Sequence, residues 1–200
     1  MRTRQRGVGY PWRLAVLTVS LTLIAGISRS SIAQNLNAGD QPTARVRVDN
    51  LAAAPVETLR FAEACATEVF SRIGARVRWI DEETAVRGHL AAQYTLVLVN
   101  AEHDPGIPGI QDSLGVAAPQ LRRAYVFYDR IDALRVRQPA NVAIILGAVI
   151  AHELGHLMLA SFRHSGNGIM SPSATIRAEP LDSFTASQAR EILSRLRQAP

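Results

Sequence analysis

Cysteine is nearly absent from this chain of 200 residues, and lysine is absent altogether. Cys65 is the only cysteine, so no disulfide can form within the chain, and a stable fold must come from an apolar core or a bound metal. Cys65 stands between two alanines in a helical pattern, which predicts a small, buried apolar residue rather than a nucleophile. Internal repeats and low-complexity tracts are also missing, and the length indicates one domain.

Basic charge is not in excess outside the N-terminal segment. The formal charge is +5, but five of the 22 basic residues precede Gln34, and the remaining 17 are matched by 17 acidic residues. No stripe of basic residues with interleaved aromatic residues is left. We therefore expect no nucleic-acid partner.

Residues 1–33 have the pattern of a secretory signal peptide. Arginines are followed by an apolar segment from Leu14 to Ile27 and by a small-x-small cleavage site ending at Ala33. We therefore expect a small, exported, bacterial-type protein, secreted or periplasmic, in which a flexible leader over 34–44 follows the cleavage site. An uncleaved membrane anchor is the alternative, although the apolar segment is short for a spanning helix.

The rest of the chain, 45–200, alternates between strand and helix patterns. Apolar periodicity predicts a helix from Pro55 to Gly74, a short charged helix or turn over 129–137, and a helix from Ala186 to Leu196. Alternating or continuous β-rich segments predict the strands 45–49, 76–80, 94–99, 114–117 and 124–128. This order favours an α+β fold in which helices pack on one sheet.

The segment Ala151-His152-Glu153-Leu154-Gly155-His156-Leu157 is an H-E-x-x-H within an apolar run over 142–159. On a helix, residues four apart share a face, so His152 and His156 can bind one metal ion with Glu153 beside them. Two neutral imidazoles suit zinc, and the carboxylate can take a proton from metal-bound water. The alternatives are a transmembrane span, against which the three polar residues stand, and a structural helix whose buried polar groups would each need a partner.

A third protein ligand is needed, and His164 is the first candidate, since a glycine-containing turn could bring it back to the metal. Glu179 and Glu191 are the acidic alternatives further along the chain. A second pair, His103 and Asp104, lies in a loop rich in proline and glycine, where it could bind another metal or substrate but is more typical of turn chemistry.

Residues 152–172 resemble the metzincin clan of zinc metallopeptidases, and its matrixin branch in particular. That clan has the pattern H-E-x-x-H-x-x-G-x-x-H followed by a methionine turn. The resemblance implies that His152, His156 and His164 are the Zn²⁺ ligands, that Glu153 is the general base, and that Met170 in Gly-Ile-Met-Ser-Pro is the Met-turn residue.

The chain departs from the clan's pattern at two positions. Leu159 stands at the family's glycine and Phe162 at its third histidine, so His164 comes two residues late. Either the helix runs further and the loop reaches the metal by another route, or a downstream glutamate completes the site as in the thermolysin-like branch.

The resemblance also implies a fold and an activity. The fold would be a twisted mixed sheet of four to five strands with a packing helix, a zinc-binding helix, a Met-turn and a C-terminal helix, which Thr185 and Gln188 can open with a capping box. The activity would be that of a monomeric zinc-dependent metalloendopeptidase acting on peptides or proteins. The alternative is a zinc-binding non-peptidase module or a decayed paralogue with the same fold.

Overall fold

The computed structural model describes residues 41–80, 91–108, 110–134, 142–172 and 181–198. The expected signal peptide and most of the expected leader lie outside these ranges, as do Glu179 and the acidic segment 81–83. Everything that follows concerns the unit that begins at residue 38.

Five strands form one mixed sheet in the order β2-β1-β3-β5-β4. The first four of these strands are mutually parallel, and β4 runs antiparallel to β5 at the edge. The expectation of a mixed sheet of four to five strands is confirmed, with five strands observed. The strands are β1 Thr43–Asn50, β2 Arg76–Ile80, β3 Tyr94–Val99, β4 Gly115–Ala118 and β5 Arg123–Phe127.

Within the described residues, four helices accompany the sheet, besides two short 3₁₀ turns, η1 Ala101–His103 and η2 Pro119–Leu121. The first expected helix ends at Ser71, and the capping box of the last one is formed by hydrogen bonds in both directions between Thr185 and Gln188. The helices are α2 Val56–Ser71, α4 Tyr128–Leu134, α5 Val142–Leu159 and α6 Ala186–Gln198.

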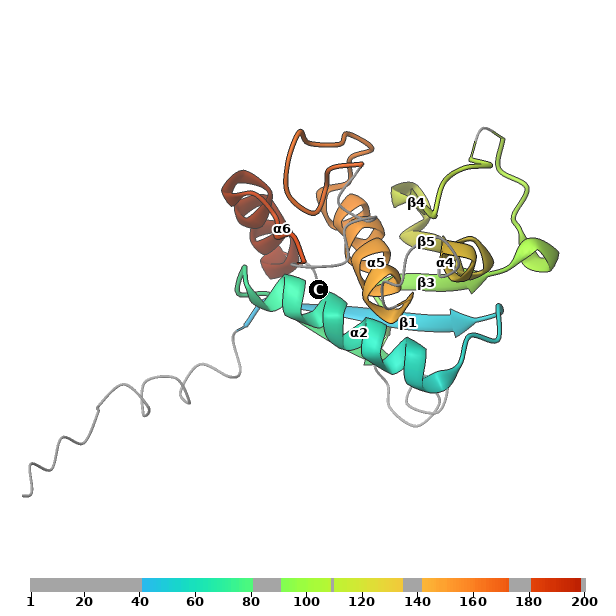
Figure 1. Cartoon of the computed structure of the whole chain (residues 1–200). Helices are drawn as coiled ribbons and strands as arrows, with labels where there is room; N and C mark the ends of the chain where they lie inside the picture. Colours follow the sequence, from blue (N-terminus) through green and yellow to red (C-terminus); the bar gives the residue numbers. More distant parts are fainter. Residues whose placement is uncertain (1–40, 81–90, 109, 135–141, 173–180, 199–200) are drawn as a thin grey trace, which may run out of the picture. The chain divides into compact units, whose positions relative to one another are not determined.

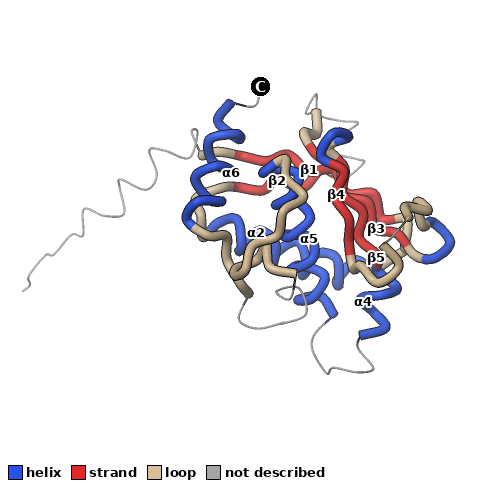
Figure 2. Tube along the Cα trace, turned by 90° about the horizontal axis from the view of Figure 1, so that it is seen from above, coloured by secondary structure: helices blue, strands red, loops and turns tan. Residues whose placement is uncertain are grey.

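The main core lies between the sheet and the helices α2 and α5, which run side by side over it (Figures 1 and 2). Leu96 and Leu98 of the central strand β3 face this core, whereas Val97 and Val99 face a smaller cluster with Phe127 on the other side of the sheet. β3 is therefore covered on both faces, as its continuous apolar sequence predicted.

The helix α5 is the most deeply buried element, with 16 of its 18 residues buried. Among the described helices it is the one long and apolar enough to cross a membrane, but 89% of that stretch is enclosed by the rest of the protein. The apolar run over 142–159 is therefore explained by a core helix, and the transmembrane alternative is not needed.

The closest approach between α2 and α5 occurs at Gly147. A Cβ atom added there would lie 2.5 Å from the Cβ atom of Cys65 and 2.8 Å from the carbonyl oxygen of Ala62. Cys65 is half-buried, so it is more exposed than the sequence predicted, because it lies at the margin of the interface between the two helices.

Candidate metal centre

His152, Glu153 and His156 lie in the C-terminal half of α5 and are only 4 to 6% exposed. The two histidines are one helical turn apart, and their ring centroids are separated by 4.8 Å. Both imidazoles therefore point to the same side of the helix, as the H-E-x-x-H spacing predicted.

Each of these imidazoles has its Nδ1 atom at a backbone carbonyl. His152 Nδ1 lies 2.7 Å from the oxygen of Ile169, and His156 Nδ1 lies 2.7 Å from the oxygen of Ser161. A carbonyl oxygen can only accept a hydrogen bond, so the proton of the neutral ring is on Nδ1 and the lone pair is on Nε2. This arrangement fixes both rings with Nε2 available to a metal.

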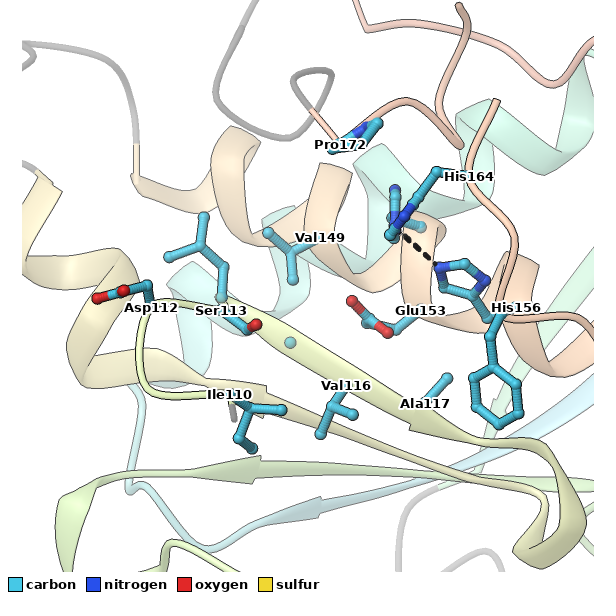
Figure 3. A pocket seen from close by; sticks show the side chains of 14 residues that line it. Ile110, Asp112, Ser113, Val116, Ala117, Val149, Glu153, His156, His164 and Pro172 are labelled. Carbon is cyan, nitrogen blue, oxygen red and sulfur yellow. Dashed lines mark hydrogen bonds between the residues drawn. The ribbon is translucent and has the colours of Figure 1, made fainter. Parts of the chain in front are cut away.

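His164 brings a third imidazole to the same point (Figure 3). Its Nε2 atom lies 3.1 Å from that of His152 and 3.4 Å from that of His156, and the latter two are 3.1 Å apart. A tetrahedral zinc ion with Zn–N bonds of about 2.0–2.1 Å separates its nitrogen ligands by roughly 3.4 Å. The three atoms are thus spaced as zinc ligands, and the group fits zinc binding.

The protonation states agree with that fit. The pKa of His152 is lowered to about 4, mainly by burial; the carbonyl of Ile169 opposes this shift, and the charges of His156 and His164 add to it. Burial also lowers the pKa of His156, against the effect of the Ser161 carbonyl. Both rings are therefore neutral at pH 7, which is the form that binds a metal.

The path of the chain to His164 explains why this histidine comes two residues late. The helix ends in a Schellman turn, in which the N–H of Ala160 donates to the oxygen of Leu157 and the N–H of Ser161 donates to that of His156. The left-handed residue is Ala160, with φ of 46°, one position beyond Leu159. The helix therefore runs further than the clan's pattern, and the following loop is longer.

Met170 lies directly beneath the histidine-bearing turn of α5. It is fully buried, and a Cβ atom added at Gly155 would meet its sulfur at 2.5 Å. The chain turns tightly around it, since the N–H of Ser171 donates to the oxygen of Gly168, whose φ is 72°. The oxygen of Met170 also accepts from the N–H of Ser165, next to His164. This one segment thus supports the rings from below and from the side.

Glu153 points into a cleft of about 380 Å³ between α5 and the edge strand β4 (Figure 3). Burial raises the pKa of its carboxyl group to about 8. A Cβ atom added at Gly115 of β4 would lie 2.7 Å from both Cγ and Oε1 of Glu153. Only a glycine leaves room for this carboxylate between the helix and the strand.

Arg130 of α4 holds the wall of this cleft. Its Nη1 atom donates to the oxygens of Ile110 and Ser113 at 2.7 and 2.8 Å, and Ile110 and Ser113 both line the cleft. Its Nη2 atom contacts Asp104 at 2.8 Å, and its guanidinium carbon lies 3.7 Å from the centroid of the Phe127 ring. No sequence pattern indicates this role, because the partners of Arg130 are backbone carbonyls and residues distant along the chain.

The remaining candidates that lie within the described residues, His103, Asp104 and Glu191, do not join the histidines. Asp104 accepts from the N–H of Gly106 and pairs with Arg130, and His103 Nδ1 lies 2.9 Å from the side-chain oxygen of Asn100, which is turn chemistry. Glu191 pairs with Arg195 on the surface of α6. Within the described parts of the chain, the three histidines are the one group of such side chains with metal-binding spacing.

Comparison with solved structures finds the same arrangement of helices and strands in archaeal proteins. A zinc-dependent peptidase from Methanocorpusculum labreanum has a TM-score of 0.52 and 15% identity, covering 74% of this chain and 99% of its own. Archaemetzincin from Methanopyrus kandleri has a TM-score of 0.53 and 15% identity, covering 80% of this chain and 98% of its own. The chain shares their fold. No protein-family model matches the sequence, and a search among curated proteins finds no match.

Proposed function

We propose that this chain is a zinc-dependent metallopeptidase, with His152, His156 and His164 as zinc ligands and Glu153 as the general base. The observation that carries the proposal is the convergence of three Nε2 atoms within 3.1 to 3.4 Å of one another at the side of a cleft that also holds a carboxylate. The shared fold with a zinc-dependent peptidase supports the same activity.

When bound, zinc would supply a water of lowered pKa, near ~7, and would polarise a substrate carbonyl. Glu153 accepts a proton from the attacking water and passes it to the leaving amine. It must be ionised to do so, and the charge of a bound zinc ion would oppose the effect of burial, which raises the pKa of Glu153. The carbonyls of Ile169 and Ser161 keep the imidazoles oriented during turnover.

The finer assignment is to the metzincin clan with Met170 as its Met-turn residue. Its burial beneath Gly155 supports this role. Pro172, two residues after Met170, is the feature that favours the matrixin branch. The substrate is a peptide or protein, which the cleft between α5 and β4 would accept in extended form.

Export is a further part of the proposal. It is supported by the basic, apolar and small-residue segments over 1–33, and it places the enzyme in the periplasm or outside the cell. N-terminal sequencing of the protein recovered from an expressing bacterium should start at Gln34. A start at Met1 in a membrane fraction would indicate the uncleaved anchor instead.

The central experiment combines zinc content by elemental analysis with turnover of a mixed peptide library. Four proteins are compared: wild type, Glu153→Gln, His164→Ala, and His103→Ala as a control that removes an exposed histidine outside the centre. We expect one zinc per chain in wild type, Glu153→Gln and His103→Ala, and loss of zinc in His164→Ala. The rate of peptide cleavage should fall on the order of 10² to 10⁴-fold in Glu153→Gln, because this variant lacks the general base. Cleavage should be lost in His164→Ala, because this variant lacks the metal.

The same experiment separates the rival functions. Stoichiometric zinc with no cleavage by wild type would favour the zinc-binding module or decayed paralogue. Full zinc in His164→Ala would exclude that residue as the third ligand and return Glu179 and Glu191 to consideration.

A further inference from the structure

A second cavity, of about 640 Å³, lies at the C-terminal end of α5 and contains none of the three histidines. Its wall is formed by the last turn of α5, the start of β3, η2 and α6. The side chains that matter for its chemistry are Arg45, Arg122, Arg195, Tyr94, Leu157 and Met158. Its volume is within the range of small-molecule sites in proteins.

Among the described residues that line this cavity, the charged side chains are all arginines. Arg122 follows η2 with a left-handed φ of 49°, and its guanidinium has no hydrogen bond or ion pair to any described residue. Arg195 contacts one oxygen of Glu191 on its own helix, with a side chain 47% exposed. Arg45 donates to the oxygen of Ala91. The cavity is therefore positively charged.

Tyr94 adds a polar group at the same place. Tyr94, Arg122 and Arg195 line the same cavity. Burial raises the pKa of the Tyr94 phenol, and the charges of Arg122 and Arg195 lower it. Leu157 and Met158 add apolar surface to the same lining. Two guanidinium groups and a phenol hydroxyl beside an apolar wall suit an oxyanion attached to an apolar body.

We propose that this cavity binds a small organic anion, with its oxyanion held by Arg122, Arg195 and the hydroxyl of Tyr94 and its apolar part against Leu157 and Met158. This site is separate from the metal centre and does not depend on the proposed peptidase activity. A structural explanation competes with it, since arginines near the C-terminal end of α5 also complement the negative end of the helix dipole.

The test is calorimetric titration of the purified chain with benzoate, and with benzamide as a neutral ligand of the same shape. The zinc is removed first with a chelator, because a carboxylate could otherwise bind to the metal. The variants are Arg122→Gln, Arg195→Gln and Tyr94→Phe, with Arg190→Gln as the matched control, since Arg190 is an exposed arginine of α6 that does not line the cavity.

We expect saturable benzoate binding by wild type and none by benzamide. Arg122→Gln and Arg195→Gln should each weaken benzoate binding about tenfold or more, as loss of a charge-assisted hydrogen bond does, and Tyr94→Phe by less, whereas Arg190→Gln should leave it unchanged. Equal binding of benzoate and benzamide, no saturable binding at millimolar benzoate, or equal losses in Arg190→Gln and Arg122→Gln would overturn the proposal. Lower melting temperatures of the arginine variants without any effect of benzoate would instead support the helix-dipole role.

Discussion

Substitution of Gly115 by alanine should separate catalysis from metal binding. The three atoms nearest the added Cβ all belong to Glu153, at 2.7, 2.7 and 2.9 Å, whereas ordinary contact begins at 3.4 Å. The carboxylate, or the edge strand β4, must therefore move by about 0.3 Å to reach 3.0 Å, and by about 0.7 Å to reach ordinary contact at 3.4 Å. A misplacement of about 1 Å at a reacting group can reduce the rate on the order of 10²-fold.

We therefore expect kcat to fall by roughly 10- to 100-fold in Gly115→Ala, with one zinc per chain retained. The free energy of unfolding should fall by no more than about 2.5 kcal/mol, because overpacking costs about 1–3 kcal/mol and alanine in place of a strand glycine recovers about 0.5–1 kcal/mol. The assay is turnover of the peptide library beside zinc content and thermal melting. Gly166→Ala is the control, since no atom lies within 4 Å of a Cβ added there.

Two results would refute this reasoning. Unchanged turnover in Gly115→Ala would mean that β4 yields without disturbing Glu153, or that Glu153 is not the base. Loss of zinc in parallel with turnover would mean that the strand supports the whole metal centre rather than the carboxylate alone.

Three further predictions concern the scaffold around the centre. Gly147→Ala should lower the free energy of unfolding, measured in urea, by about 1–3 kcal/mol or more, because the added Cβ atom would meet Cys65 and a backbone carbonyl of α2. A free energy of unfolding equal to that of wild type would contradict the close packing of α2 and α5. Arg130→Met should raise KM for peptides several-fold with zinc content unchanged, because it removes the donor to the carbonyls of Ile110 and Ser113 in the cleft wall. A decrease confined to kcat would argue against a role of Arg130 in holding that wall. In the metal-free chain, the pKa of Glu153 rises from 4.5 in the unfolded state to about 8 in the folded state, so its contribution to stability is fully present below pH 4.5 and is lost as the pH rises through about 8. The pKa of His152 falls from 6.5 to about 4, so its contribution is present above pH 6.5 and is lost as the pH falls toward 4. The two effects oppose each other between about pH 4.5 and 6.5, so the melting temperature should be nearly constant there and should decline as the pH rises toward 8. Glu153→Gln should remove this decline on the alkaline side.

Local pattern was enough to predict the elements and to bring together two of the proposed metal ligands. The bounds of β2, β3 and α5 follow from continuous or periodic apolar residues, and the i, i+4 spacing of His152 and His156 fixes their common face. His164 was predicted from the resemblance and from its position after the helix, and the structure brings it to the other two.

Contacts made through the backbone could not be predicted from the same patterns. The carbonyls of Ile169 and Ser161 carry no side-chain signature, and the close approach of Gly115 to Glu153 depends on how β4 packs against α5. The hydrogen bonds from Arg130 to the cleft wall could not be predicted either, since their acceptors are the backbone oxygens of Ile110 and Ser113 and no side-chain pattern in that loop indicates Arg130 as the donor. These features come from tertiary packing, which a single sequence does not specify locally.

The turn at Ala160 has a consequence for how relatives of this protein are recognised. The helix ends one residue late and the loop is longer, yet His164 arrives within 3.1 Å of His152. The position of the proposed third ligand is thus determined by a point in space rather than by a fixed count of residues after the second histidine. A sequence search that requires the clan's spacing between the second and third histidines would miss this chain. A search that allows seven residues between these histidines, followed by a methionine, would find this chain and others with the same longer loop.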